Sequence, residues 1–265
     1  MTAPLFAVAS GKGGVGKTVL SIALTQSFAA NGERTLLVDG DLGLANIDVQ
    51  LGLAPRGDLI GVIAGGLTLV DAVVPYDGGA GVRRGFDVIA GRSGHGALRT
   101  LPQRDLELLG RSLRMASAGY QRTIVDLGAG LDPVMLELAC AAGRVLVILT
   151  DEPTSLTDAY ALIKLLSQRE TPPGLAIAVN MAANAADGRR AYGALERACS
   201  KFLGLAPPLA GIVRRDPQVR DAIRAQTPYL TRSPAGAAAN DITGLAAALD
   251  AAFAPPAAAP LRRLR

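Results

Sequence analysis

One stretch near the start of the chain decides its fold, and it reads Gly11-Lys12-Gly13-Gly14-Val15-Gly16-Lys17-Thr18. An apolar run at residues 5–9 precedes this stretch, and a helical pattern at residues 17–30 follows it. Four residues separate its first and last glycines and a Lys-Thr pair comes next, which is the spacing of a Walker A loop. The pattern therefore predicts a strand, a phosphate-binding loop and a helix, in that order.

The glycine, lysine and threonine residues of this loop each suit a part of phosphate and Mg²⁺ binding. Glycines let the backbone curl so that successive N–H groups point at phosphate oxygens, and the following helix adds the positive end of its dipole. We expect Lys17 to reach the β- and γ-phosphates of ATP and the Thr18 hydroxyl to bind Mg²⁺. The alternative is a glycine-rich turn followed by a chance Lys-Thr pair.

Beyond the loop, short apolar runs alternate with helical patterns. Strands are expected at residues 5–9, 35–39, 86–90, 123–127, 145–150, 175–180 and 209–213. Helices are expected at residues 17–30, 104–116, 132–142, 155–168, 188–202, 217–225 and 241–253, with short helices and loops at 54–84. Runs rich in Val, Ile and Leu that alternate with helices predict one α/β domain over residues 1–253. Its mostly parallel, twisted sheet carries helices on both faces, in a three-layer sandwich.

Aspartates stand at the ends of two expected strands. Asp39 ends the run at residues 35–39 and Asp41 follows two residues later, while Asp126 lies in the run at residues 123–127. Carboxylates at this edge of a parallel sheet face the ligand crevice, and an Asp there, beside a phosphate loop, binds Mg²⁺ directly or through water. The spacing from Asp126 to Gly130 also fits a switch in which the glycine backbone senses the γ-phosphate. In the alternative interpretation, these aspartates cap turns.

Composition excludes other classes of protein. The net charge is +4 and the arginines are scattered, which argues against a protein whose main task is to coat nucleic acid, although a modest basic patch stays open. Specific nucleic-acid binding is not expected. Cys140 and Cys199 form no CxxC pair and His95 is the only histidine, so zinc sites, disulfide frameworks and acyl-transfer triads lack support. No apolar run approaches the ~18 residues of a membrane span. A reduced, cytoplasmic protein is expected.

Lys12 carries a resemblance to a known family. The string from Lys12 to Thr18 resembles the deviant Walker A motif of the ParA/MinD superfamily of P-loop ATPases, and the likeness extends over about residues 5–253. It implies ATP and Mg²⁺ as cofactors and slow, partner-stimulated hydrolysis of ATP to ADP and phosphate. It also implies an ATP-dependent homodimer in which Lys12 reaches the phosphates of the partner's nucleotide. Without the resemblance, Lys12 is a solvated side chain at the loop mouth.

The same resemblance implies roles for further residues. Asp41 belongs to the first switch and positions the attacking water, so that Lys12, Lys17 and Asp41 form the catalytic set. Asp39 lies near Mg²⁺ through water, while Thr18 and Asp126 complete the metal site. Asn180 ends a strand and either contacts adenine with its paired donor and acceptor or caps a turn.

Two stretches narrow the family. Residues 41–53 resemble the MinD side of the superfamily, and residues 152–164 resemble the FlhG/FleN/YlxH group of flagellar-number regulators. This implies an ATP switch that controls flagellar number or placement, with an FlhF-like GTPase or flagellar switch proteins as partners. One alternative is a MinD-type division-site ATPase. Another is a ParA-like partition ATPase that binds DNA non-specifically through the arginines Arg189, Arg190, Arg214, Arg215 and Arg220.

The chain departs from the family pattern in one loop, in its last helix and tail, and before its first predicted strand. Arg214 stands where the family usually has proline, which affects the loop on the adenine side. The helix at residues 241–253 lacks a basic face, so we expect it to pack in the core. Residues 254–265 form a flexible basic tail, and tail and helix predict at most weak association with the inner membrane or cell pole. The extension that stimulates a partner GTPase in related regulators is not expected, because the first predicted strand begins at Leu5.

Overall fold

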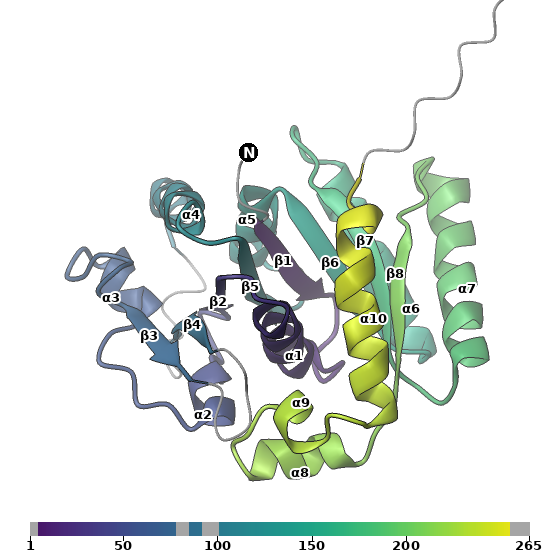
Figure 1. Cartoon of the computed structure of the whole chain (residues 1–265). Coiled ribbons are helices and arrows are strands. Elements are labelled where there is room, and N and C mark those ends of the chain that lie inside the picture. Colours follow the sequence, from purple (N-terminus) through teal and green to yellow (C-terminus); the bar gives the residue numbers. More distant parts are fainter. Residues whose placement is uncertain (1–4, 78–84, 92–100, 255–265) are drawn as a thin grey trace, which may run out of the picture.

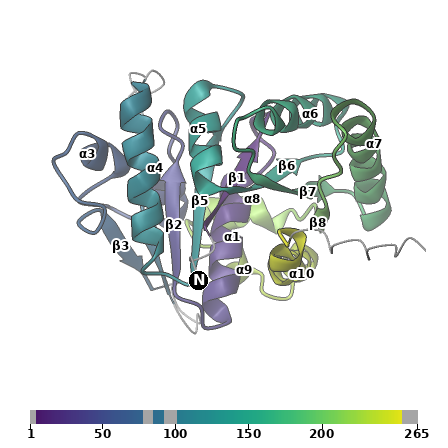
Figure 2. The same cartoon turned by 90° about the horizontal axis from the view of Figure 1, so that it is seen from above.

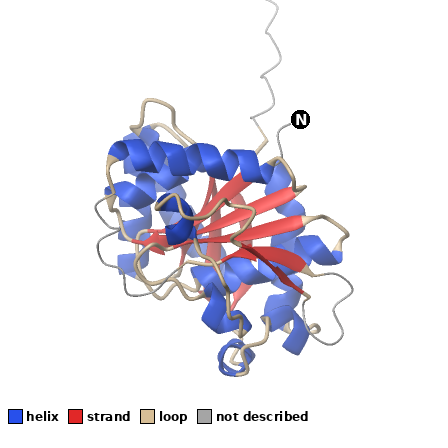
Figure 3. Ribbon diagram, turned by 90° about the vertical axis from the view of Figure 1, so that its left-hand side faces the viewer, coloured by secondary structure: helices blue, strands red, loops and turns tan. Residues whose placement is uncertain are grey.

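An eight-stranded sheet runs through the computed structural model, which describes residues 5–77, 85–91 and 101–254. The strand order is β3-β4-β2-β5-β1-β6-β7-β8, and every neighbouring pair is parallel except β3 with β4. The strands are β1 (Leu5–Ser10), β2 (Thr35–Gly40), β3 (Val73–Tyr76), β4 (Phe86–Ile89), β5 (Arg122–Ala129), β6 (Arg144–Leu149), β7 (Gly174–Ala182) and β8 (Leu209–Arg214). Figure 3 shows this sheet as a layer between helices.

Helices cover both faces of the sheet. They are α1 (Lys17–Ala30), α2 (Ile47–Leu51), α3 (Leu59–Ile63), α4 (Gln103–Ser117), α5 (Pro133–Ala142), α6 (Pro153–Ser167), α7 (Ala185–Leu203), α8 (Gln218–Arg224), α9 (Tyr229–Arg232) and α10 (Ala237–Ala252). Helices α4, α5, α6 and α7 lie on one face, and α1 and α10 lie on the other (Figures 1 and 2). The structure confirms the predicted α/β class and the mostly parallel, three-layer sheet.

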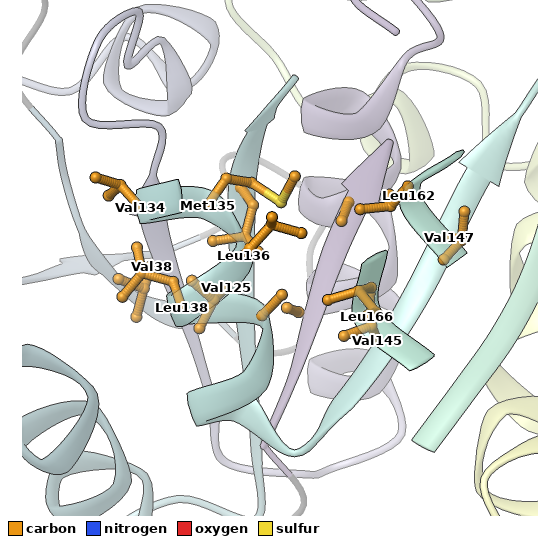
Figure 4. Packing of buried hydrophobic residues seen from close by; sticks show 14 of the residues in the cluster. Val38, Val125, Val134, Met135, Leu136, Leu138, Val145, Val147, Leu162 and Leu166 are labelled. Atoms are coloured by element: carbon orange, nitrogen blue, oxygen red, sulfur yellow. The ribbon is translucent and has the colours of Figure 1, made fainter. Parts of the chain in front are cut away.

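Strands buried on both faces divide the core into two clusters. Val38, Val125 and Val145 contribute to the cluster beneath α5 and α6, where Leu138 and Leu166 pack against them (Figure 4). The second cluster lies beneath α1 and α10. Because successive strand side chains point to opposite faces, apolar residues at every position supply both clusters at once.

Strand β3 is the strand that the sequence did not predict. It pairs antiparallel with β4 at the sheet edge, with Pro75 opposite Asp87. A proline within a short run argues against a strand, but an edge strand tolerates it because one side of its backbone needs no partner. The short helices α2 and α9 were not predicted either. Helices α7 and α10 begin at Ala185 and Ala237, each several residues before the predicted start.

Helix α10 is a core helix, as the sequence indicated. Ile242, Leu245 and Leu249 are each at most 2% exposed, and the helix packs on β8 and α1. Its apolar face is therefore covered by the protein itself. The predicted tail at residues 254–265 lies outside the described residues apart from Ala254. Within the described part of the chain, we find no helix with the length and hydropathy to cross a bilayer.

Arg214, at the position where the resembled family usually has proline, is hydrogen-bonded to Asp241. Its backbone N–H donates to Asp241 Oδ2 at 3.0 Å, and its guanidinium donates to both carboxylate oxygens at 2.8 and 2.9 Å. A proline has no N–H to donate. The arginine therefore joins the end of β8 to the first turns of α10, and this defines the backbone at the start of the following loop.

A core position on α10 gives a test of this packing. We expect Leu245→Ala to lower the free energy of unfolding by about 2–5 kcal/mol, the usual cost of a cavity at a buried leucine. Urea denaturation measures it. Thr243→Ala, on the exposed side of the same helix, is the control and should cost far less. Equal stabilities of the two variants would contradict a core role for α10.

Candidate functional site

The phosphate-type loop joins β1 to α1 at the carboxyl edge of the sheet. Ser10 Oγ donates to the Lys12 carbonyl at 2.6 Å, and the Leu20 amide donates to the Gly16 carbonyl at 3.1 Å as α1 begins. Gly16 has a φ of 85°, a conformation that favours glycine. The loop is thus a backbone cradle closed by a helix N-terminus, which suits an anion.

Glycine is also required where the loop meets α6. A Cβ on Gly11 would lie 2.2 Å from the carbonyl oxygen of Asp158, which is in α6. That distance is shorter than any real contact, so no side chain fits between the loop and the helix. The start of the loop is therefore held directly against α6.

Behind the loop lies a buried carboxylate, Asp126 on β5, which is 2% exposed. Ser21 Oγ donates to Asp126 Oδ1 at 2.9 Å, and the Thr18 hydroxyl also donates to this carboxylate. Burial raises the pKa of Asp126 to about 6, although Thr18, Lys17 and Ser21 oppose the shift. Burial also lowers the pKa of Lys17, against the opposing charges of Asp126 and Asp41. The predicted Thr18, Lys17 and Asp126 do meet in space.

Asp39 lies opposite Asp126 in the register of β2 and β5 and is 1% exposed. Its Oδ1 accepts from the Asp41 amide at 3.2 Å, and its Oδ2 accepts from the Asn46 and Ile47 amides at 3.0 Å each. Burial, together with the charge of Asp126, raises the pKa of Asp39 to about 7. Asp39 therefore holds the loop at residues 41–46 and the start of α2, and its contact with Mg²⁺ through water stays a prediction.

Asp41, in the first predicted switch, faces the segment of the second. Its Oδ1 accepts from the Gly43 and Leu44 amides at 3.1 and 2.9 Å. A Cβ on Gly128 would lie 3.3–3.4 Å from the carboxylate of Asp41, so this group faces the segment after β5. There the Gly130 amide donates to the Ser10 carbonyl at 3.1 Å. The predicted switches at Asp41 and Gly130 thus both lie beside the loop. Within the described structure, the backbone amides that donate to Asp41 all donate to Oδ1, and none donates to Oδ2.

Asn180 reaches the loop from β7. It is 8% exposed, and its Nδ2 donates to the Val15 carbonyl at 2.8 Å. Met181, the next residue, has a φ of 56°, and its Cε lies 3.1 Å from where a Cβ on Gly16 would be. The Asn180 side chain thus supports the loop from the side rather than capping a turn of its own, and its contact with adenine stays a prediction.

Lys12 points to α6 in the isolated chain. Its Nζ lies 2.5 Å from Glu152 Oε2 and 2.9 Å from Thr154 Oγ1. The side chain is 36% exposed, so it is neither buried nor simply solvated. Sequence reasoning anticipated a role for this lysine but not its acceptors, which lie 140 and 142 residues away.

The donor set fits Mg²⁺ together with a nucleotide. Mg²⁺ prefers oxygen ligands, binds through one or two carboxylates, and completes its shell with phosphates and water. Thr18 and Asp126 supply such oxygens beside Lys17. Among the described residues no group of three or more His, Cys, Asp or Glu is arranged to hold a metal ion, and Mg²⁺ in sites with few protein ligands takes the rest from phosphates and water.

Comparison with known proteins agrees with this geometry. Residues 6–229 match the CobQ/CobB/MinD/ParA nucleotide binding domain. The chain belongs to this family. ATP with Mg²⁺ is accordingly the ligand of the loop in this MinD/ParA-family protein.

Within this family, the chain is similar to several individual proteins. The chain is 36% identical to the antiactivator FleN of Pseudomonas aeruginosa over 84% of this chain and 77% of that one. It is 30% identical to the flagellum site-determining protein YlxH of Helicobacter pylori, over 70% and 60% of the two chains. Among solved structures, MinD of Pyrococcus horikoshii in complex with Mg-ADP superposes with a TM-score of 0.74 at 24% identity, covering 94% and 96%. The last likeness shows the fold.

Some functional neighbours were missed at the sequence level. Ser21 lies one helical turn beyond Thr18 on α1, so its position gave a signal that a polar group faces the same site. Glu152 and Thr154 lie in a stretch that was noticed only for its likeness to relatives. Nothing local to that stretch indicated that it meets Lys12.

The buried carboxylates predict an unusual pH dependence. The pKa of Asp39 is about 7 in the folded protein, against 3.8 as its ordinary value. Between about pH 4 and pH 7 the folded protein then binds more protons than the unfolded chain, so the free energy of unfolding falls as pH rises. The slope reaches at most about 1.4 kcal/mol per pH unit for one proton.

Urea denaturation of the nucleotide-free protein at several pH values measures this slope. We expect a shallower slope in Asp39→Asn, whatever the offset caused by its altered hydrogen bonds. Mg²⁺ with ATP should also flatten the wild-type slope, because a nearby cation favours ionised carboxylates. Parallel curves for the variant and the wild type would show that Asp39 is ionised throughout this range.

Proposed function

We propose that this protein is an ATP-driven switch that regulates the number or placement of flagella. The observation that carries the proposal is the meeting of Lys12, Lys17, Asp41 and Asp126 around one loop, in a chain that resembles FleN over most of its length. Lys17 and the loop amides bind the phosphates, and Thr18 and Asp126 hold Mg²⁺. Asp41 orients the attacking water.

The switch works through dimerisation. Two copies associate through this face when ATP is bound, and Lys12 of each copy crosses to the phosphates of the other. A cation placed there stabilises charge that develops during phosphoryl transfer. Hydrolysis is slow, and partner proteins stimulate it. The dimer is the signalling state, and hydrolysis ends it.

Two observations favour flagellar regulation over DNA partitioning. The flagellum site-determining protein YlxH resembles this chain over 70% of its length, and the antiactivator FleN, of the same FlhG/FleN/YlxH group, resembles it over 84%. Among the arginines considered for DNA contact, Arg190 is paired with Asp187 and Arg214 with Asp241. These pairs reduce the positive field that non-specific phosphate binding needs. Flagellar switch proteins or an FlhF-like GTPase are the expected partners.

A pair of variants tests the switch. We expect Asp41→Asn to accumulate an ATP-dependent dimer and to slow hydrolysis by at least about tenfold, since general-base and positioning roles contribute ~10²–10⁴-fold. Asparagine retains an oxygen for the Gly43 and Leu44 amides, so the loop is preserved. Lys12→Ala should stay monomeric with ATP. Light scattering after size exclusion measures both, and wild-type hydrolysis by Asp41→Asn would refute the catalytic role.

Cellular output needs its own test. Flagella per cell are counted by electron microscopy in P. aeruginosa that lacks FleN, with and without this chain. We expect the wild-type chain to shift the count towards that of the parent strain, and Lys17→Ala to leave it unchanged because the loop no longer binds phosphates. Equal expression of both proteins is the control. No shift by a well-expressed wild-type chain would count against the flagellar assignment.

A further inference from the structure

Helix α4 presents a row of four exposed side chains, Arg104, Leu108, Arg111 and Met115, which is named here the α4 stripe. Residues three and four apart are neighbours on a helix surface, so the four side chains lie one above another on a single side of α4. Leu108 is 50% exposed and Met115 is 77% exposed. The α4 stripe therefore combines two cationic and two large apolar groups on the surface.

The opposite side of α4 holds the helix on the sheet. Leu106, Leu109 and Leu113 are at most 4% exposed and belong to the core cluster on this face of the sheet. Asp105 is half-buried in the first turn, where a carboxylate suits the helix dipole. The outer side of such a helix is ordinarily polar, so packing does not account for the exposed leucine and methionine of the stripe.

The arginines of the stripe lack a counter-charge. Within the described residues, no ion pair or hydrogen bond engages Arg104 or Arg111. Glu107 and Arg114 flank the stripe on one side and offset each other's charge, and Arg114 also donates to the Ala141 carbonyl at 3.1 Å. The stripe itself is therefore positive beside exposed apolar groups. This combination fits a surface that offers anionic groups above an apolar layer.

The stripe lies at the end of the molecule where the described chain stops. Figure 1 shows α4 end-on at the same end as the last turn of α10, and Figure 2 shows α4 along its length. The description stops at Ala254, and the following residues include Arg262, Arg263 and Arg265. A convex helix offers no groove to a partner peptide, whereas a flat bilayer contacts α4 and a separate basic segment at once.

We propose that the α4 stripe is a contact surface for an anionic lipid bilayer. Arg104 and Arg111 bind headgroup phosphates, and Leu108 and Met115 enter the boundary between headgroups and acyl chains. Stable attachment takes two weak signals rather than one, and the stripe and the basic tail supply them. The stripe contains no residue of the nucleotide site, so this inference stands independently of the proposed ATP switch.

Vesicle sedimentation tests this surface with the whole chain free of nucleotide. The vesicles are phosphatidylcholine alone and phosphatidylcholine mixed with phosphatidylglycerol. We expect the wild type to bind the mixed vesicles more tightly. The double variant Arg104→Gln/Arg111→Gln should bind them about 5- to 30-fold more weakly than the wild type, since each arginine near an anionic surface contributes about fivefold. Met115→Gln should weaken binding by a smaller factor and leave its salt dependence unchanged, because it removes only an apolar contact.

Arg220→Gln/Arg224→Gln is the matched control. It removes the same charge from two exposed arginines of α8, which lies at the opposite end of the molecule (Figure 1). Any general effect of net charge on vesicle binding appears in this control as well, and it should be small. Glutamine is a good helix former, so thermal unfolding of both double variants should match that of the wild type.

The comparison of the two double variants decides the inference. If they bind the mixed vesicles equally well, α4 is not the contact and the inference is overturned. A wild type that sediments with neither kind of vesicle also overturns it. If the wild type binds poly-L-glutamate through Arg104 and Arg111 but does not bind vesicles, the stripe serves an acidic protein and the lipid assignment is wrong. Dimerisation with ATP is measured separately, so failure of the proposed function is distinguishable from each of these results.

Discussion

The burial of Asp126 beside the phosphate loop is the constraint on which the rest of the site depends. A carboxylate in the middle of a sheet loses its hydration, and this penalty must be offset by hydrogen bonds and positive charge. Ser21 and Thr18 donate to it, and Lys17 lies within its field. All three residues belong to α1, so their interactions with Asp126 on β5 tie the first turns of this helix to the sheet beside the phosphate loop.

A second buried carboxylate, Asp39, lies between Asp126 and the loop at residues 41–46. Both of its carboxylate oxygens accept hydrogen bonds from backbone amides, which belong to the loop at residues 41–46 and to the start of α2. Its own charge is disfavoured by burial and by Asp126. A cation that enters beside Asp126 stabilises both ionised carboxylates, and the hydrogen bonds to an ionised Asp39 are stronger than those to a neutral one. In the proposed function, a cation beside Asp126 would therefore strengthen the contacts that hold the loop at residues 41–46.

The two lysines of the phosphate loop differ in burial and in the groups that they face. Lys17 is directed inward, where burial lowers its pKa and Asp126 and Asp41 restore part of its charge. Lys12 is directed along the surface to α6, where a carboxylate and a hydroxyl accept from it. In the proposed function, the inner lysine binds the nucleotide of its own chain and the outer lysine acts across the dimer.

The sequence by itself determined the class of fold, the loop and the ends of the strands that carry its acids. These are local properties: the period of apolar residues, the spacing of glycines and the position of an aspartate after a strand are all legible within about ten residues. The edge strand β3 escaped because Pro75 weakens the local pattern and only pairing with β4 makes it a strand.

Tertiary structure alone decided which distant groups meet. Glu152 lies 140 residues from Lys12, and Ser21 lies 105 residues from Asp126. Asp39 binds backbone amides whose positions depend on how α2 packs, and Arg214 finds Asp241 only because α10 covers β8. Contacts of this kind depend on distances of a few ångströms between packed elements, which no local pattern encodes. The sequence therefore determines the chemistry of the loop, whereas packing decides which side chains its outer lysine contacts.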